Sequence, residues 1–86
     1  MMSKLILTVD DSASMRMLLK VSLTAQGYLI EGAEDGEKGL ERMQELDPDL
    51  LITDINMPHM DGFELIEAVR ARPEFRGTPI LVLSTE

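Results

Sequence analysis

The chain has 86 residues, with 16 acidic and 8 basic side chains, a net charge of −8 and no cysteine. A chain of this length forms one small domain, which buries only about 60–65% of the surface that the unfolded chain exposes. The absence of cysteine excludes a disulfide framework and a thiolate metal site. The acidic surplus argues against binding nucleic acid or an anionic membrane surface through bulk electrostatics, so divalent cations and basic protein surfaces remain as partners.

No run of residues approaches the roughly 18 apolar residues that a membrane span requires, so we expect no membrane insertion. The segment Met1–Lys4 leads into an apolar run that is too short for a signal peptide. These features predict a cytoplasmic protein that consists of a single domain, residues 1–86.

The first predicted strand is Leu5–Val9, a run of apolar residues without alternation, which is typical of a strand buried on both faces. It stops at Asp10, and helical spacing of apolar residues follows at Met15, Leu18, Leu19 and Leu23. This pattern predicts a helix of about three turns. We expect Arg16 and Lys20 to point to solvent and Gly27 to form the C-terminal cap of this helix.

The next strand and helix are predicted between Tyr28 and Leu46. Tyr28–Ile30 is a short apolar run, and Asp35-Gly36 begins a helix with apolar residues every third position, at Leu40, Met43 and Leu46. Pro48 prevents the helix from continuing. The acidic side chains Glu37, Glu41 and Glu45 are expected to form a solvent-exposed face.

The third strand is predicted at Leu50–Thr53, and Asp54 follows it directly. After a loop, Asp61 and Glu64 have the spacing of a helix N-cap and its third residue. We therefore expect a helix from this point to about Arg72.

A fourth apolar run, Pro79–Leu83, completes a β-α-β-α-β-α-β order. Short connections between alternating elements predict an α/β fold with a doubly wound parallel sheet and right-handed crossovers. Ligands of such a sheet bind at the carboxyl ends of its strands. The residues at these ends are Asp10, Asp11, Asp54, Ser84 and Thr85.

Three carboxylates meet at one point if the first and third strands are neighbours, because Asp10 and Asp11 follow one and Asp54 follows the other. Clustered carboxylates repel and remain ionised at neutral pH only when a cation joins them. An all-oxygen site suits Mg²⁺ or Mn²⁺. A metal ion also prepares an adjacent aspartate to attack phosphorus, and the Ser84 hydroxyl could bind a phosphoryl oxygen. His59, the only histidine, lies in a loop without a zinc-ligand partner and is expected to be solvated.

Each of these residues also has a plainer interpretation. Asp10 and Asp11 could be acids at a helix N-terminus, where the helix dipole favours them. Asp54 alone would be an ordinary loop aspartate, and Ser84 and Thr85 could be a polar strand end. The combination of all three sites favours the metal and phosphoryl interpretation.

Three motifs occur in order at the strand ends: Val-Asp-Asp-Ser at 9–12, Asp-Ile-Asn-Met-Pro-His-Met-Asp-Gly at 54–62, and Pro-Ile-Leu-Val-Leu-Ser-Thr-Glu at 79–86. With these separations the chain resembles a response-regulator receiver domain, most closely the single-domain chemotaxis (CheY-like) type. CheY is itself an example of the doubly wound, flavodoxin-like sheet. The resemblance implies the strand order 2-1-3-4, with the fifth strand and last two helices of the family missing.

The resemblance also implies a role for each matching residue. Asp54 corresponds to the phosphoacceptor, which takes a phosphoryl group from a histidine kinase, CheA-like in chemotaxis. Asp10 and Asp11 correspond to the acidic pair that holds Mg²⁺, and Asn56 to the residue whose backbone carbonyl completes the metal site. Ser84 corresponds to the switch hydroxyl.

Five further positions and the output follow from the same resemblance. Thr85 corresponds to the small residue after the switch hydroxyl. Met57, Pro58, Asp61 and Gly62 are expected to shape the loop and begin the following helix. The implied activity is that of a signalling phosphoacceptor rather than a conventional enzyme, with a flagellar-motor protein or another protein as the output target.

The chain also departs from the family pattern. The family's fifth-strand lysine, which contacts the phosphoryl group, is missing, so we expect impaired phosphorylation. Gly39 occupies a helix position where the family usually has alanine, at a cost of about 1 kcal/mol.

Self-association is the alternative function that we consider. Without a fifth strand, Ile80–Leu83 presents an uncharged strand edge, and apolar surface on the sheet faces stays uncovered. This predicts a homodimer or a higher oligomer, which is compatible with the receiver interpretation.

Two other classes fit less well. A phosphatase of the haloacid dehalogenase type requires a second aspartate two residues after the nucleophile, where this chain has Asn56. In a flavodoxin, Asp10 and Asp11 would repel the cofactor phosphate.

Overall fold

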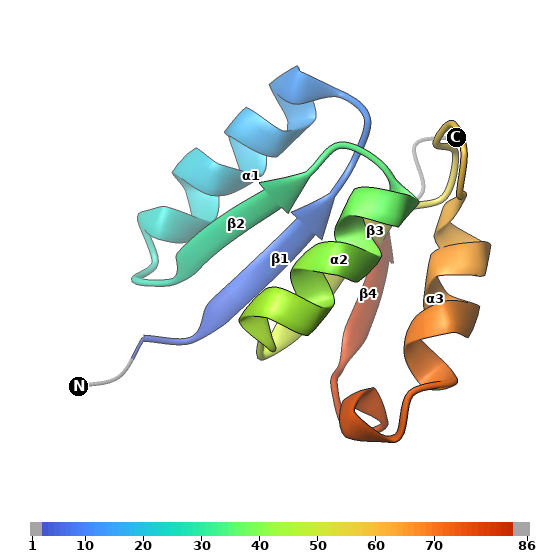
Figure 1. The fold of residues 1–86 in the computed structure, drawn as a ribbon. Helices are drawn as coiled ribbons and strands as arrows, with labels where there is room; N and C mark the ends of the chain where they lie inside the picture. Colours follow the sequence, from blue (N-terminus) through green and yellow to red (C-terminus); the bar gives the residue numbers. More distant parts are fainter. Residues whose placement is uncertain (1–2, 84–86) are drawn as a thin grey trace.

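The computed structural model describes residues 3–83, so the predicted switch residues Ser84 and Thr85 lie outside the described range. The elements in chain order are β1 (Leu5–Val9), α1 (Ala13–Thr24), β2 (Leu29–Ala33), α2 (Gly36–Leu46), β3 (Leu50–Asp54), α3 (Gly62–Arg70), the short 3₁₀ helix η1 (Pro73–Phe75) and β4 (Ile80–Leu83). The four strands form one parallel sheet in the order β2-β1-β3-β4, which confirms the predicted fold and strand order (Figure 1).

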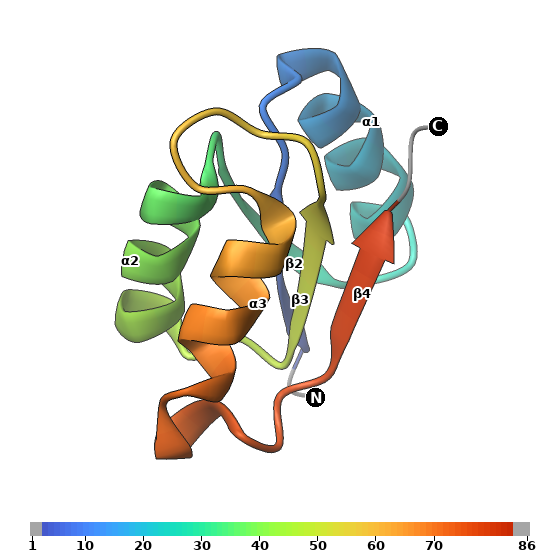
Figure 2. The same ribbon diagram turned by 90° about the vertical axis from the view of Figure 1, so that its right-hand side faces the viewer.

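The sheet is the middle of three layers. Helix α1 lies on one face, where it contacts β1 and β2, whereas α2 and α3 lie side by side on the other face (Figure 2). None of the helices between residues 3 and 83 has the length and apolarity of a membrane-crossing segment.

Side-chain caps begin the three α-helices, two of them at the predicted residues Asp35 and Asp61. The Ser12 hydroxyl and the Asp35 carboxylate accept hydrogen bonds from the main-chain N–H groups three residues later, at 3.2 and 2.9 Å. Asp61 and Glu64 form a reciprocal capping box: the Asp61 carboxylate accepts from the Glu64 N–H at 2.8 Å, and the Glu64 carboxylate accepts from the Asp61 N–H at 3.1 Å. These contacts satisfy amide groups that a helix start leaves without partners.

Two predicted helix ends are wrong by a few residues. Gly27 is not the cap of α1, because the helix ends at Thr24 with Ala25 as its cap. Gly27 instead occupies the following turn with φ 95°, and its N–H donates to the Thr24 carbonyl at 2.9 Å. Helix α3 ends at Arg70 rather than near Arg72, because the chain turns into η1 at a proline.

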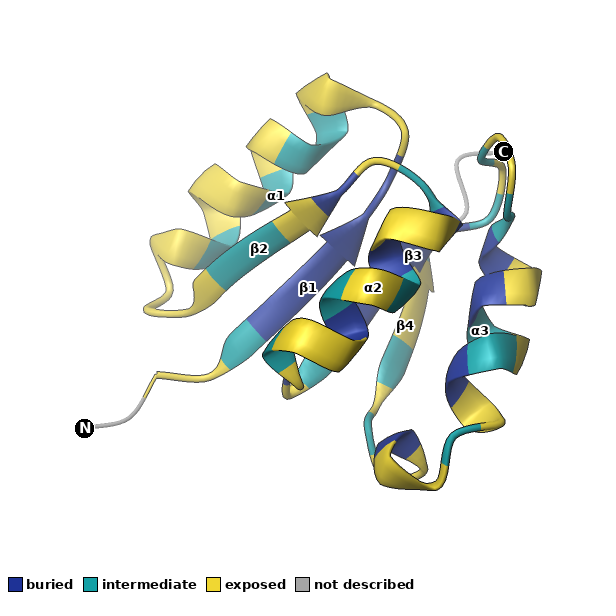
Figure 3. Ribbon diagram, viewed as in Figure 1, coloured by how far each residue is buried: buried dark blue, intermediate teal, exposed yellow. Residues whose placement is uncertain are grey.

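The hydrophobic core lies between the sheet and the α2–α3 layer. Its buried side chains are Leu7, Val9, Ala33, Met43, Leu51, Leu65, Val69 and Phe75. The helix on the other face, α1, has no buried residue (Figure 3). Leu18, which the helical spacing assigned to the inner stripe, is 58% exposed. That prediction is wrong because the part of α1 that carries Leu18 has no described element packed over it.

The register of the two central strands positions the site. Val9 of β1 pairs with Thr53 of β3, so the next residues, Asp10 just after β1 and Asp54 at the end of β3, lie at the same level of the sheet. The carboxyl ends of neighbouring parallel strands are therefore where the acidic residues meet.

Candidate functional site

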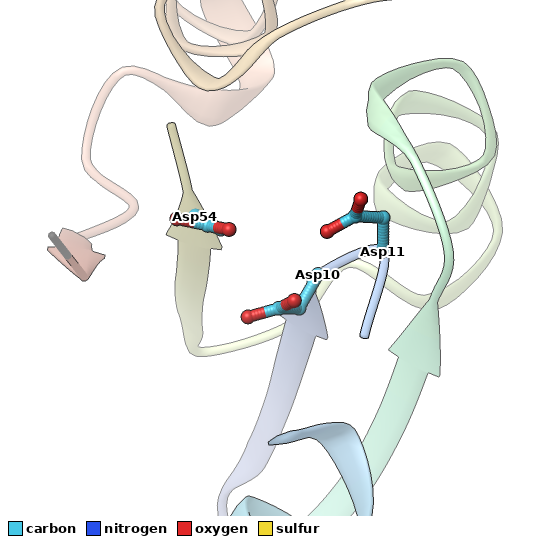
Figure 4. Close-up of side chains that lie close together, drawn as sticks. All are labelled: Asp10, Asp11 and Asp54. Atoms are coloured by element: carbon cyan, nitrogen blue, oxygen red, sulfur yellow. The ribbon is translucent and has the colours of Figure 1, made fainter. Parts of the chain in front are cut away.

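Three carboxylates converge at the carboxyl ends of β1 and β3. An oxygen from each of Asp10, Asp11 and Asp54 lies within 4.8 Å of the other two, and Figure 4 shows Asp11 and Asp54 pointing toward one another. Asp10 and Asp54 are 3% and 5% exposed, whereas Asp11 is open to solvent. This confirms that the three carboxylates form one cluster, in which the exposed member offers a route of entry.

Main-chain donors hold one oxygen of each buried carboxylate. Oδ1 of Asp10 accepts a hydrogen bond from the N–H of Ser12 at 2.8 Å, and Oδ1 of Asp54 accepts one from the N–H of Ile55, also at 2.8 Å. Within residues 3–83, no protein donor bonds to Oδ2 of either residue. Each buried aspartate therefore has one anchored oxygen and one oxygen free for a ligand.

The pKa of Asp10 is raised above its ordinary value of 3.8. Burial is the largest cause, and the neighbouring charges of Asp54 and Asp11 raise the pKa further. The Ser12 N–H and the positive charge of Arg16 act in the opposite direction. A bound cation would offset both the cost of burying the Asp10 carboxylate and its repulsion by the other two carboxylates. The donor set therefore fits a hard divalent cation such as Mg²⁺ or Mn²⁺.

Arg16 does not point to solvent as its position on the helix predicts. Its Nη1 reaches back from α1 and donates a hydrogen bond of 2.6 Å to the main-chain oxygen of Asp10. The helical period shows only which side chains share a face, whereas Arg16 is long enough to follow the helix surface to a partner beyond the helix start. Because the partner is a main-chain oxygen, no pattern of side chains in the sequence identifies this contact.

The loop after Asp54 carries the other predicted site residues. Asn56, two residues after Asp54, is exposed, and Met57 is partly buried against the core. Pro58 and His59 are exposed, and His59 has a left-handed backbone with φ 70°. This loop therefore offers main-chain and polar groups beside the carboxylate cluster.

Gly62, at the end of this loop, packs directly against the backbone of Asp54 and Ile55. Its N–H donates to the Ile55 carbonyl at 2.8 Å, and a Cβ at this position would collide with the main-chain oxygen of Asp54. Asp61 supplies the capping box described above. Asp61 and Gly62 thus begin α3 as predicted, and they bring the helix start directly to the end of β3.

Comparison with known proteins decides the family. Residues 6–86 match the response regulator receiver domain. The chain belongs to the response-regulator receiver family. It is 41% identical over 85 residues to the chemotaxis protein CheY1 of Helicobacter pylori strain J99, which covers 94% of this chain and 67% of that protein.

Solved receiver structures have the same fold. The chemotaxis response regulator CheY4 of Vibrio cholerae superposes with a TM-score of 0.95 at 42% identity, over 99% of this chain and 71% of that one. A receiver domain from Methanoculleus marisnigri gives a TM-score of 0.93 at 36% identity, over 96% of this chain and 68% of that one. The structure thus confirms a CheY-like receiver fold.

Receivers also occur within longer relatives. The sensor histidine kinase TmoS of Ectopseudomonas mendocina is 43% identical over 81 residues, which is 94% of this chain but 8% of that protein. The chain spans about two thirds of the length of its chemotaxis relatives.

Proposed function

We propose that this receiver domain accepts a phosphoryl group on Asp54 from a histidine kinase, with Mg²⁺ or Mn²⁺ held by Asp10, Asp11 and Asp54. The observation that carries the proposal is the convergence of three carboxylate oxygens within 4.8 Å of one another at the ends of β1 and β3. The backbone carbonyl of Asn56, in the loop beside them, would complete the metal site. A bound divalent ion would neutralise the attacking carboxylate and the incoming phosphoryl oxygens.

The hydrogen bond of the Asp54 carboxylate supports different roles for its two oxygens. Oδ1 is occupied by the N–H of Ile55, so Oδ2 is the free nucleophile. In the transfer, a bond forms between Oδ2 and phosphorus while the bond from phosphorus to the donor histidine nitrogen breaks. The donor ring carries a proton on its other nitrogen, so the histidine leaves as the neutral imidazole. The product is an acyl phosphate, and Ser84 and Thr85 are the proposed hydroxyl partners of its oxygens.

A small phosphodonor tests this proposal without a cognate kinase. The chain is incubated with acetyl phosphate and Mg²⁺, and its intact mass is compared with that of an Asp54→Asn variant. We expect one added phosphoryl group on the wild type and none on the variant. Glu64→Gln, which removes a charge from an exposed helix position, is a control that should still be labelled. Addition to Asp54→Asn, or no addition to the wild type after prolonged incubation, would contradict the proposal.

The rate of that reaction tests a second part of the proposal. We infer that a polypeptide of these 86 residues alone is phosphorylated slowly, because the family's fifth-strand lysine is not among them. A CheA-like kinase is the proposed donor in the cell, and a flagellar-motor or other protein is the proposed output target. Labelling as fast as that of a full-length chemotaxis receiver, measured side by side, would show that the lysine argument is wrong.

Self-association is a second candidate property, supported by exposed apolar surface near β4. Leu81 and Val82 are 54% and 41% exposed, and β4 has a strand neighbour on one side only within residues 3–83. Leu81 also lines a hollow of about 350 Å³ on the α1 side of the sheet, together with Ile6, Leu23, Tyr28, Leu50 and Ile52. A second copy of the chain would cover this surface.

The solution mass of the chain tests this second candidate. We expect light scattering to show a dimer at high micromolar concentration and a Leu81→Lys variant to be monomeric. Leu29→Lys is the matched control, because Leu29 is 57% exposed but lies in β2, at the opposite edge of the sheet. A wild-type chain that remains folded and monomeric would exclude self-association.

A further inference from the structure

Arg16 holds a positive charge beside the acidic cluster without a carboxylate partner. Its Nη1 donates at 2.6 Å to the main-chain oxygen of Asp10, which belongs to the peptide that joins Asp10 to Asp11. The ion pairs found within residues 3–83 are those that Arg42 forms with Glu31 and Glu45. The guanidinium of Arg16 is therefore fixed by the main chain of Asp10, and its positive charge opposes the rise in the pKa of the Asp10 carboxyl.

Gly32 of β2 leaves the space through which Arg16 passes. A Cβ at Gly32 would lie 3.3 Å from Cδ of Arg16 and 3.6 Å from Oγ1 of Thr8. The first distance is shorter than the 3.5–4.0 Å at which carbon atoms pack best. A Cβ at Gly32 would therefore require the Arg16 side chain to shift by a few tenths of an ångström, so this glycine of a neighbouring strand gives Arg16 room on its path.

The position of this charge has two opposite effects. Asp10, Asp11 and Asp54 repel one another when they are ionised without a metal, and a fixed cation nearby offsets part of that repulsion. The same cation repels an incoming divalent metal. Metal affinity falls to the extent that Arg16 stabilises the metal-free protein more than the metal-bound protein.

We propose that Arg16 is the resident counter-cation of the acidic site: it stabilises the metal-free protein and thereby weakens Mg²⁺ binding. Arg16 is a positioning residue, since it contacts the main chain of Asp10 rather than a reacting atom. The proposal rests on the proposed function in one respect, because its second test takes the cluster to be a cation site. Its first test requires no metal.

The first test is a double-mutant cycle in EDTA at pH 7.5 and low salt. Arg16→Met removes the charge but keeps an unbranched side chain, and Asp54→Asn removes one repelling carboxylate. We expect Arg16→Met to lower the thermal midpoint by about 4–8 °C in the wild-type background and by less than half of that in the Asp54→Asn background. Arg16→Lys should retain most of the stability. Equal losses in both backgrounds would overturn the proposal, because they would show a packing role only.

The second test measures Mg²⁺ affinity by amide NMR. We expect Arg16→Met to bind Mg²⁺ about three- to tenfold more tightly than the wild type and Arg16→Lys to bind within about twofold of it. High salt should reduce the difference, because it screens the charge. Unchanged or weaker binding by Arg16→Met would overturn the proposal.

Two further arms keep the outcomes distinct. If Arg16→Met does not fold, Arg16→Gln replaces it, since glutamine also removes the charge. Mg²⁺ binding to Arg16→Gln should then also tighten, and unchanged binding would overturn the proposal. If the wild type binds no Mg²⁺, the proposed function fails, but the cycle in EDTA still decides the role of Arg16.

Discussion

Gly62 begins α3 directly against the main-chain carbonyl of Asp54. A Cβ at Gly62 would collide with that carbonyl oxygen and would lie 2.9 Å from Cα of Ile55. Because glycine has no Cβ, the start of α3 can lie in direct contact with the backbone of Asp54, the proposed phosphoacceptor. The geometry of the site depends on this close approach of two backbones.

Gly62→Ala is expected to destabilise the protein by about 1–3 kcal/mol, because backbone atoms on both sides cannot move aside for a methyl group. Urea unfolding measures the change. Gly77→Ala is the control: it has open space around the added Cβ and should change stability by less than about 0.5 kcal/mol. Equal effects of the two substitutions would show that the contact with Asp54 does not constrain position 62.

Gly39→Ala is expected to lower stability by about 1 kcal/mol, although alanine favours a helix by about the same amount. The added Cβ would lie 2.9 Å from Cγ2 of Val9, a branched core side chain with little freedom to move, and 3.4 Å from Cδ2 of Leu65. Overpacking of this kind costs about 1–3 kcal/mol, which exceeds the propensity gain. Thermal unfolding in a Val9→Ala background should show a smaller loss, whereas a higher midpoint for Gly39→Ala alone would contradict this account.

Asp10→Asn is expected to raise the metal-free stability at neutral pH. Because the pKa of Asp10 is raised in the folded protein, the folded state binds the proton more tightly than the unfolded state does. Stability is therefore lost as the pH rises from the unfolded value, about 3.9, through the raised folded pKa. The advantage of Asp10→Asn in EDTA should accordingly be present at pH 7 and disappear below pH 3.8.

Saturating Mg²⁺ supplies the control for Asp10→Asn. The wild type should gain more stability from the metal than the variant, since asparagine offers a neutral ligand in place of a carboxylate. A variant that is less stable than the wild type in EDTA at pH 7 would show that burial and repulsion at Asp10 are not the dominant effects.

The sequence predicts those parts of the molecule that depend on local patterns. Apolar runs predict the strands, and Asp35 and Asp61 predict two of the helix starts, because capping is a contact over three residues. The meeting of Asp10 and Asp54 requires the first and third strands to be neighbours, and the resemblance to the receiver family implies that order.

The parts that the sequence does not predict depend on contacts between distant elements. The partner of Arg16 is a main-chain oxygen, which has no sequence signature, and the side chain runs past a glycine in another strand. The exposure of Leu18 depends on what packs over α1, and helical spacing carries no information about that. Gly39 is a weak helix residue by propensity, but the tight contact with Val9 explains why glycine fits there.

The most direct test of the central claim is a Mg²⁺ titration of the labelled chain followed by amide NMR. The account predicts that the largest shifts occur at Asp10, Asp11, Asp54 and the adjoining loop, and that they disappear in Asp11→Asn and Asp54→Asn. Glu41→Gln, which removes an exposed acid from α2, should leave the titration unchanged. The absence of shifts at the three aspartates, or shifts spread evenly over the exposed acidic residues, would contradict the claim that they form one cation site.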